Sequence, residues 1–144
     1  MAVELGPADP PQFPAILSLW REATEVPSST DDLAGLTALW RRDPRALIVA
    51  TEDGRPVGTV IAAWDGWRGG LYRLAVLPSH RGRGIARALV ADGEAHLGRH
   101  GCRRISLFAV AAHTGAVAFW NAVGYRPDDG EIRFTTNLGR PRDT

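Results

Sequence analysis

An apolar segment that leads into a glycine- and arginine-rich turn, and then into an amphipathic segment, is the feature that most constrains this fold. Residues 71–77 are mainly apolar and predict a strand, which Pro78 ends because proline fixes φ and lacks a backbone donor. The turn Arg81-Gly82-Arg83-Gly84 follows. From Ile85 to Leu97 apolar residues recur at helical spacing, which predicts a helix that starts at the turn.

A strand, a glycine-rich turn and a helix N-terminus, in this order, predict a site for an anion. Glycines let successive backbone N–H groups point to one side, and the helix N-terminus adds partial positive charge. Arg81 and Arg83 would add charge-assisted donors. We interpret the turn as a pyrophosphate site; a plain connection between strand and helix is the alternative.

Other phosphate-binding motifs do not fit this turn. A Walker loop needs lysine, and all 17 basic residues of the chain are arginine. The Rossmann fingerprint needs a third glycine where Arg87 stands. Arg-Gly repeats also bind RNA, but usually in disordered segments, whereas this turn lies between a predicted strand and a predicted helix.

Arg81-x-x-Gly84-x-Ala86 after this strand resembles the signature Arg/Gln-x-x-Gly-x-Gly/Ala of the GNAT superfamily of N-acetyltransferases. The resemblance implies the α/β GNAT fold in a single domain over 1–144, with a mixed, mostly antiparallel sheet of six to seven strands and four helices. The implied element order is strand, two helices, three strands, helix, strand, helix, two strands. Acetyl-coenzyme A would be the co-substrate, with its pyrophosphate on the loop amides and its pantetheine arm along the strand. The implied cofactor-binding residues are Leu74, Ala75, Val76, Arg81, Gly82, Arg83, Gly84, Ile85, Ala86, His113 and Trp120.

A second stretch, 113–125, is similar to the family's fourth-helix pattern Asn-x-x-Ala-x-x-Phe/Leu-Tyr-x-x-x-Gly-Phe. His113 replaces the asparagine that contacts the cofactor arm, and imidazole can still donate or accept a hydrogen bond. Trp120 replaces a tyrosine that protonates the departing thiolate in many members. Indole is a donor only, so Trp120 cannot be a general acid, and a packing role is an equal alternative. The residues that match the pattern are Ala116, Phe119, Gly124 and Tyr125.

The resemblance implies direct attack of a primary amine, on a small molecule or a peptide, on the acetyl thioester in a ternary complex. A backbone N–H near Ala75 or Val76 would polarise the thioester carbonyl. A free alkyl amine has a pKa of roughly 10.4 and must lose a proton. The catalytic base stays unassigned, and a catalytically silent acyl-coenzyme A-binding module is the alternative function. Four carboxylates lie in segments expected to border the acceptor site, although the simpler interpretation of each is a surface charge: Glu22, Glu25, Asp31 and Asp65.

The rest of the chain predicts two amphipathic helices, a hairpin and further strands. Trp20 and Trp40 lie on the apolar faces of these helices and are expected in the core. Trp64, Asp65 and Trp67 could line an acceptor site or a dimer contact. The expected elements are a strand at 3–5, helices at 10–22 and 33–40 with caps at Asp9 and Ser29-x-x-Asp32, strands at 46–51 and 57–64 joined at Asp53-Gly54, a strand at 104–110, a hairpin at 125–138 and a frayed tail from Gly139.

Composition sets the remaining expectations. With 144 residues, 44% apolar and 23% charged, and a net charge of +1, we expect a soluble protein without a strong field toward nucleic acid or membrane. The single Cys102 excludes an intramolecular disulfide and a cysteine-based zinc site. With no signal peptide or membrane segment apparent, we expect a cytoplasmic protein that uses no metal; a homodimer stays open.

Overall fold

The computed structural model describes residues 2–23 and 28–139. The chain forms two compact units, Met1–Phe108 and Ala109–Thr144. The expectation of one domain over the whole chain stays a prediction.

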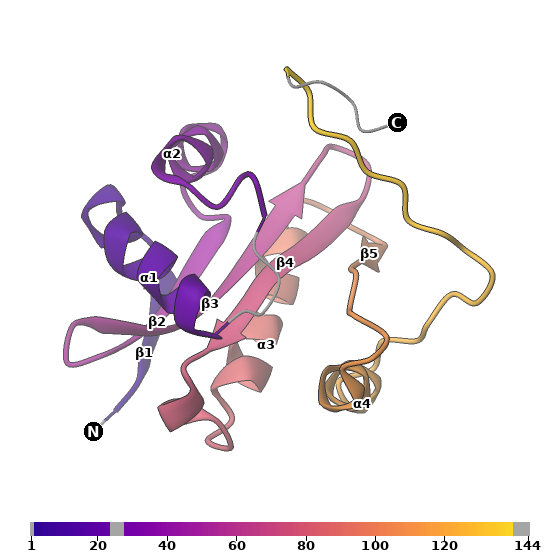
Figure 1. Ribbon diagram of the computed structural model, residues 1–144. Helices are drawn as coiled ribbons and strands as arrows, with labels where there is room; N and C mark the ends of the chain where they lie inside the picture. Colours follow the sequence, from indigo (N-terminus) through magenta and orange to yellow (C-terminus); the bar gives the residue numbers. More distant parts are fainter. Residues whose placement is uncertain (1, 24–27, 140–144) are drawn as a thin grey trace. The chain divides into compact units, whose positions relative to one another are not determined.

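The first unit contains a five-stranded sheet in the order β1-β2-β3-β4-β5 (Figure 1). Its first four strands pair antiparallel, and β4 pairs parallel with β5. The sheet is therefore mixed and mostly antiparallel, as expected. The strands are β1 Glu4–Pro7, β2 Leu47–Glu52, β3 Arg55–Trp64, β4 Gly69–Val76 and β5 Ile105–Ser106.

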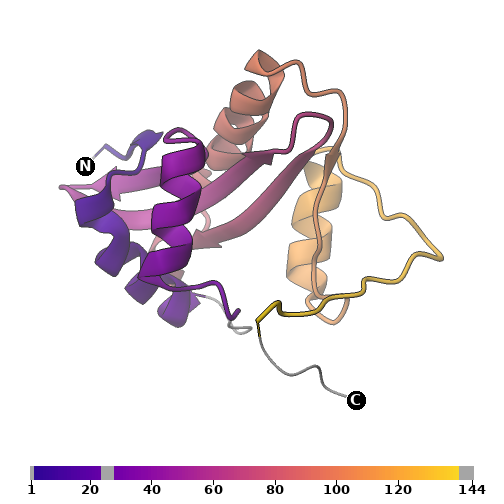
Figure 2. The same ribbon diagram turned by 90° about the horizontal axis from the view of Figure 1, so that it is seen from above.

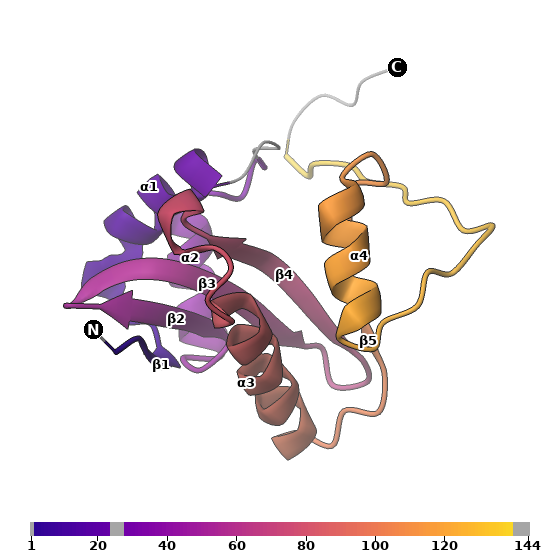
Figure 3. The ribbon, with the colours of Figure 1, turned by 90° about the horizontal axis from the view of Figure 1, so that it is seen from below.

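Helices cover both faces of this sheet. Figure 2 shows α1 and α2 on one face and α3 on the other, and Figure 3 shows α3 from its own side. Short 3₁₀ turns at Pro10–Gln12 and Pro78–His80 precede α1 and the loop before α3. The helices are α1 Phe13–Ala23, α2 Leu33–Arg42, α3 Ile85–Arg99 and, in the second unit, α4 Thr114–Ala122.

The core lies on both sides of β3, which explains why this strand is apolar over most of its length. Ile16 of α1, Val60 of β3 and Leu89 of α3 are fully buried. The face expected for α1 is confirmed, since Phe13, Ile16, Leu17 and Trp20 are all buried. Helices on both faces leave no solvent-facing side at the centre of the strand.

The turn between β2 and β3 forms as its sequence predicts. Asp53 and Gly54 both have positive φ, at 52° and 76°. Two such residues make the type I′ turn, whose twist suits a two-residue hairpin. At the start of α2, in contrast, the cap is Asp32, which accepts a hydrogen bond from the Gly35 N–H at 2.7 Å, so the expected role of Ser29 is wrong.

The expected six to seven strands are wrong, because residues 2–23 and 28–139 form a sheet of five. Of the strand expected at 104–110, only Ile105–Ser106 pairs. In the described part of 125–144, which ends at 139, no strand forms where the terminal hairpin was expected. Apolar and polar residues do alternate there, but the apolar Ile132 and Phe134 are 78% and 90% exposed. Alternation stabilises a strand only where one face is buried, and no face of this segment is.

No helix within the described ranges is long and apolar enough to cross a membrane.

Two glycine-to-alanine changes test the packing of β4 against the end of α3. A Cβ on Gly69 would lie 2.8 Å from Leu97 Cδ1 and 2.9 Å from Cys102 Sγ, whereas a Cβ on Gly98 would meet nothing within 4 Å. We expect Gly69→Ala to lower the free energy of unfolding by about 1–3 kcal/mol through overpacking. Gly98→Ala should raise it by up to about 1 kcal/mol, because alanine favours the helix.

Urea unfolding of both variants and the wild type measures the difference. A Gly69→Ala variant as stable as the wild type would contradict the close approach of β4 and α3.

Candidate functional site

One edge of β4 is largely unpaired. β5 pairs with β4 only at Gly69 and Gly70. Beyond them, residues 71–76 have no strand partner on this edge anywhere in the described chain. Their other edge pairs with β3. One edge of the second half of β4 therefore has no strand beside it in the described chain, in the stretch that leads to the glycine loop.

The direction of each amide follows from one hydrogen bond. The Leu77 N–H donates to the Val57 carbonyl at 2.9 Å, so it faces β3. Successive residues of a strand face opposite edges. The amide of Ala75 therefore also faces β3, opposite Thr59, and the amides of Leu74 and Val76 face the free edge. Of the two amides expected to polarise a carbonyl, only that of Val76 is available there.

A β-bulge sets the position of these amides. Thr59 lies opposite Ala75 and Ile61 opposite Tyr72, so two residues of β4, Arg73 and Leu74, share one position of β3. Arg73 has φ +51°. A side chain in this left-handed region costs roughly 1–2 kcal/mol, so the surrounding structure must hold the bulge in place.

Four side chains form a polar network that holds the bulge. The buried Trp20 Nε1–H donates to Thr59 Oγ1 at 2.8 Å, and the Thr59 hydroxyl donates to the Arg73 carbonyl at 2.8 Å. The Arg73 guanidinium pairs with both oxygens of Asp31, at 3.0 and 2.5 Å. Its carbon lies 5.7 Å from the centroid of a Trp20 ring. Residues from α1, β3 and the segment before α2 thus fix one residue of β4.

The glycine loop offers a row of open donors. Gly82 and Gly84 have φ of +78° and +81°, and a Cβ on either would meet nothing within 4 Å. Backbone conformation, not space, thus favours glycine there. Within the described chain, none of the amides of 82–87 donates a hydrogen bond of good geometry; the Ala88 N–H, bonded to the Gly84 carbonyl at 3.1 Å, is the first that does. This arrangement suits an anion.

The two loop arginines are held by protein groups. Arg83 Nη1 lies 3.4 Å from Glu52 Oε2, and His80 Nε2 lies 3.1 Å from Glu52 Oε1. The hydrogen bond from His80 is the main reason that the pKa of Glu52 is lowered, with a smaller contribution from the Arg83 charge. Arg81 Nε donates to the Val76 carbonyl at 3.3 Å, at the free edge of β4. Next to the loop, Ile85 is buried and Ala86 half-buried.

A cavity of about 380 Å³ lies at the hairpin end of β3 and β4. It includes the expected Trp64 and Asp65 but not Trp67, whose ring lies under the Arg68 guanidinium. The residues that give it its chemical character are Arg42, Trp64, Asp65, Arg68, Tyr72 and Phe108.

Two of the described base candidates, Asp31 and Asp65, are held by other groups of the protein. Asp31 is paired with Arg73. Asp65 Oδ1 accepts hydrogen bonds from the backbone N–H groups of Arg68 and Trp67, which lower the pKa of Asp65 and keep it ionised. Glu22 is exposed on α1, and Glu25 lies outside the described residues.

The second unit holds the two substituted family positions. His113 precedes α4, and the Trp120 ring packs edge-on against Phe119 and Tyr125, with centroids 5.2 Å apart in both pairs. The helix ends before Gly124, whose φ is +101°, as expected. The roles of His113 and Trp120 at the cofactor stay predictions.

Sequence reasoning missed the network around the bulge. The one signal for it was Thr59, a polar residue at the centre of an apolar strand. Nothing in the sequence marks Arg73 as a bulge residue, because its left-handed conformation goes against its own preference.

Comparison with known proteins agrees with this architecture. The model of the acetyltransferase (GNAT) family matches residues 13–125. Acetyltransferase ECA0875 of Pectobacterium atrosepticum is 32% identical over 117 residues, which are 81% of this chain and 83% of that protein. Acetyltransferase SG1711 of Sodalis glossinidius is 30% identical over 120 residues, 83% and 84% of the two chains.

Solved structures share the fold. The aminoglycoside N-acetyltransferase AAC(6')-Iy in complex with CoA has a TM-score of 0.78 at 20% identity, over 95% of this chain and 96% of that one. The NatC complex bound to Gag peptide and CoA has a TM-score of 0.74 at 22% identity, over 86% and 84%. Family match, relatives and fold agree, so this chain belongs to the GNAT family and is an N-acetyltransferase.

Proposed function

We propose that the protein transfers the acetyl group of acetyl-coenzyme A to a primary amine by direct attack in a ternary complex. The observation that carries this proposal is the free edge of β4, which continues into the open amides of 82–87. An extended arm that ends in a pyrophosphate fits such an edge followed by such a loop.

The pantetheine arm and the thioester of the cofactor can each be assigned a position along β4. A pyrophosphate on the loop sends the arm back along the strand, past the Val76 amide and toward the Leu74 amide. Leu74 directly follows the bulge at Arg73. Its N–H would polarise the thioester carbonyl as a single oxyanion donor, which stabilises the charge that develops on oxygen. The Trp20–Thr59–Arg73 chain supports this assignment by holding the residue before the donor.

The reaction can be written without an assigned acid or base from the protein. The ammonium form of the acceptor first loses a proton to water. The neutral amine nitrogen then attacks the thioester carbon, the C–S bond breaks, and coenzyme A leaves as a thiolate. The proton of the amine passes to water, since Asp31 and Asp65 are committed to other partners. The indole of Trp120 cannot protonate the thiolate, and lost general-acid help costs about 10²–10⁴-fold. Proximity and carbonyl polarisation remain, so we infer a slow but competent enzyme.

The cavity at the hairpin end supports an acceptor that carries an acidic group beside its amine. Arg42 and Arg68 outnumber the single carboxylate of Asp65. Guanidinium groups bind carboxylate or phosphate in bidentate geometry and repel cations. Aminoglycosides, which one structural neighbour acetylates, carry several amines and fit this charge less well than an amino acid or an acidic peptide.

An acetyl-transfer assay with a panel of amines tests the function. Acetyl-coenzyme A is mixed with the protein and, separately, aminoglycosides, polyamines, amino acids and acidic peptides, and free thiol and acetylated product are measured. We expect turnover, fastest with acceptors that bear an acidic group. Tight coenzyme A binding without turnover on any amine would contradict the proposal and favour a silent binding module.

A charge placed in the loop tests the pyrophosphate site. Gly84→Glu adds bulk and negative charge beside the amides of 82–87, so we expect the coenzyme A dissociation constant to rise at least about tenfold, from the loss of one charged contact. Gly101→Glu is the matched control, since Gly101 has φ +84° and open space at the far end of α3. Calorimetry measures both. Equal affinities would contradict the site.

Removal of one hydroxyl tests the bulge. Thr59→Val leaves the buried Trp20 N–H without its acceptor and the Arg73 carbonyl without its donor. We expect kcat to fall about tenfold or more, with a smaller effect on coenzyme A affinity, and the free energy of unfolding to fall by about 1–3 kcal/mol.

Thr59→Ser keeps the hydroxyl and serves as the control. Circular dichroism checks that both variants fold. A folded Thr59→Val enzyme with the kcat of the wild type would show that the network does not position the reacting groups.

A further inference from the structure

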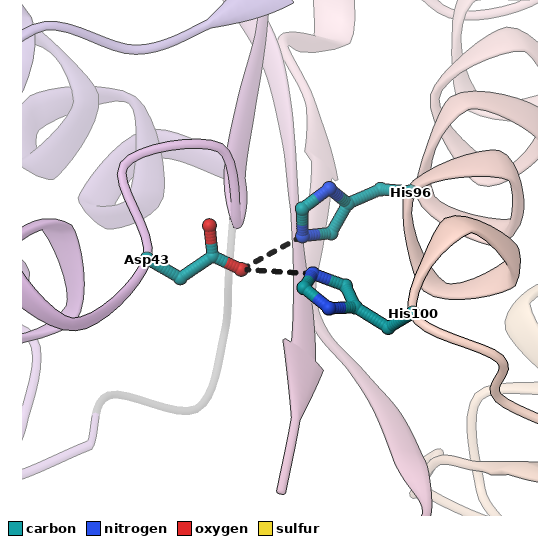
Figure 4. A group of neighbouring side chains, drawn as sticks. All are labelled: Asp43, His96 and His100. Atoms are coloured by element: carbon teal, nitrogen blue, oxygen red, sulfur yellow. Dashed lines mark hydrogen bonds and ion pairs between the residues drawn. The ribbon is translucent and has the colours of Figure 1, made fainter. Parts of the chain in front are cut away.

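We propose that Asp43, His96 and His100 bind a divalent transition-metal ion, of which Zn²⁺ is the best fit, at the end of α3 away from the glycine loop. Figure 4 shows the two imidazoles side by side, with the Asp43 carboxylate facing both. One ligand atom from each residue lies within 4.8 Å of the other two.

The ends of α2 and α3 bring these three side chains together. His96 and His100 are four positions apart in the sequence, His96 in the last turns of α3 and His100 at its C-cap, so they lie on one face with ring centroids 5.0 Å apart. Asp43 ends α2 and leads toward β2. Its Oδ2 lies 2.8 Å from His96 Nε2 and 3.9 Å from His100 Nε2.

The spacing suits a tetrahedral ion. Bonds of about 2.0–2.2 Å from zinc to nitrogen and oxygen place neighbouring ligand atoms roughly 3.3–3.5 Å apart. The two observed distances from Asp43 Oδ2, 2.8 and 3.9 Å, bracket this value. The nitrogen atoms of the two imidazoles lie within 4.8 Å of each other. Side-chain shifts on the order of 1 Å would therefore seat the ion in place of the present hydrogen bond.

Surrounding contacts orient the ligands. The Arg45 N–H donates to Asp43 Oδ1 at 3.0 Å, which leaves Oδ2 for the imidazoles. His96 is 3% exposed, and the Trp64 ring stacks on His100. Such outer contacts fix the orientation of metal ligands.

The donor set selects the metal. Two imidazoles and one carboxylate suit Zn²⁺, Ni²⁺, Co²⁺ or Cu²⁺ better than Mg²⁺ or Ca²⁺, which prefer oxygen alone. The His100 side chain is 40% exposed, so water can complete the coordination. Because α3 has 15 residues, the ion would lie about 20 Å from the glycine loop. It would join α2 to α3 and take no part in acetyl transfer.

Metal titration of the chelator-treated protein tests the site. We expect one Zn²⁺ to bind per chain by calorimetry, the melting temperature to rise with Zn²⁺ but not with Mg²⁺, and Co²⁺ to give the visible bands of a four-coordinate site. Failure to bind either ion would overturn the proposal and leave a hydrogen bond between Asp43 and His96.

Variants assign the ligands. His100→Gln should weaken Zn²⁺ binding at least about tenfold and abolish the thermal shift, because it removes a direct ligand while the Asp43–His96 contact stays. Asp92→Asn is the matched control, since Asp92 is an exposed carboxylate one helical turn before His96. Cys102→Ser controls for thiol ligation. Unchanged binding in His100→Gln, or an equal loss in either control, would overturn the assignment.

Discussion

The hydrogen bond from the Thr59 hydroxyl to the Arg73 carbonyl is the contact on which the proposed chemistry depends. It holds Arg73 of β4, a non-glycine residue, in the left-handed region, a conformation that the isolated chain disfavours. Trp20 and Asp31 hold the same residue from its other sides. Because three separate segments converge on this one residue, the direction of the following amide is set by tertiary structure and not by local preference.

The bulge, the free edge and the loop follow one another along the chain, from β4 to the start of α3. The bulge aims the Leu74 amide, the short β5 leaves that edge open, and the loop amides continue the row of donors into α3. Each part is made of backbone, so side-chain identity matters mainly where it holds the backbone in place. This arrangement explains why Trp120 in the usual tyrosine position leaves the proposed donors intact.

The sequence predicted those parts whose signals are local. The Arg-Gly loop, the Asp53-Gly54 turn and the buried face of α1 depend on nearby residues, and all formed as expected. The bulge at Arg73 and the Asp43–His96–His100 cluster depend on residues far apart in the chain, and no local pattern reveals them. The prediction of two terminal strands was wrong for a related reason. The alternation of apolar and polar residues in 131–138 indicates which face a strand would bury, but not whether another element covers that face.

The arginines of the glycine loop have one more consequence. Arg81 donates to the Val76 carbonyl, two residues after the proposed thioester donor Leu74, and all 17 lysine or arginine residues of this protein are arginine. A guanidinium stays protonated at neutral pH and is a poor nucleophile, whereas a lysine amine in its place would compete for the acetyl group. An enzyme built in this way holds a reactive thioester close to positive charge without modifying its own side chains.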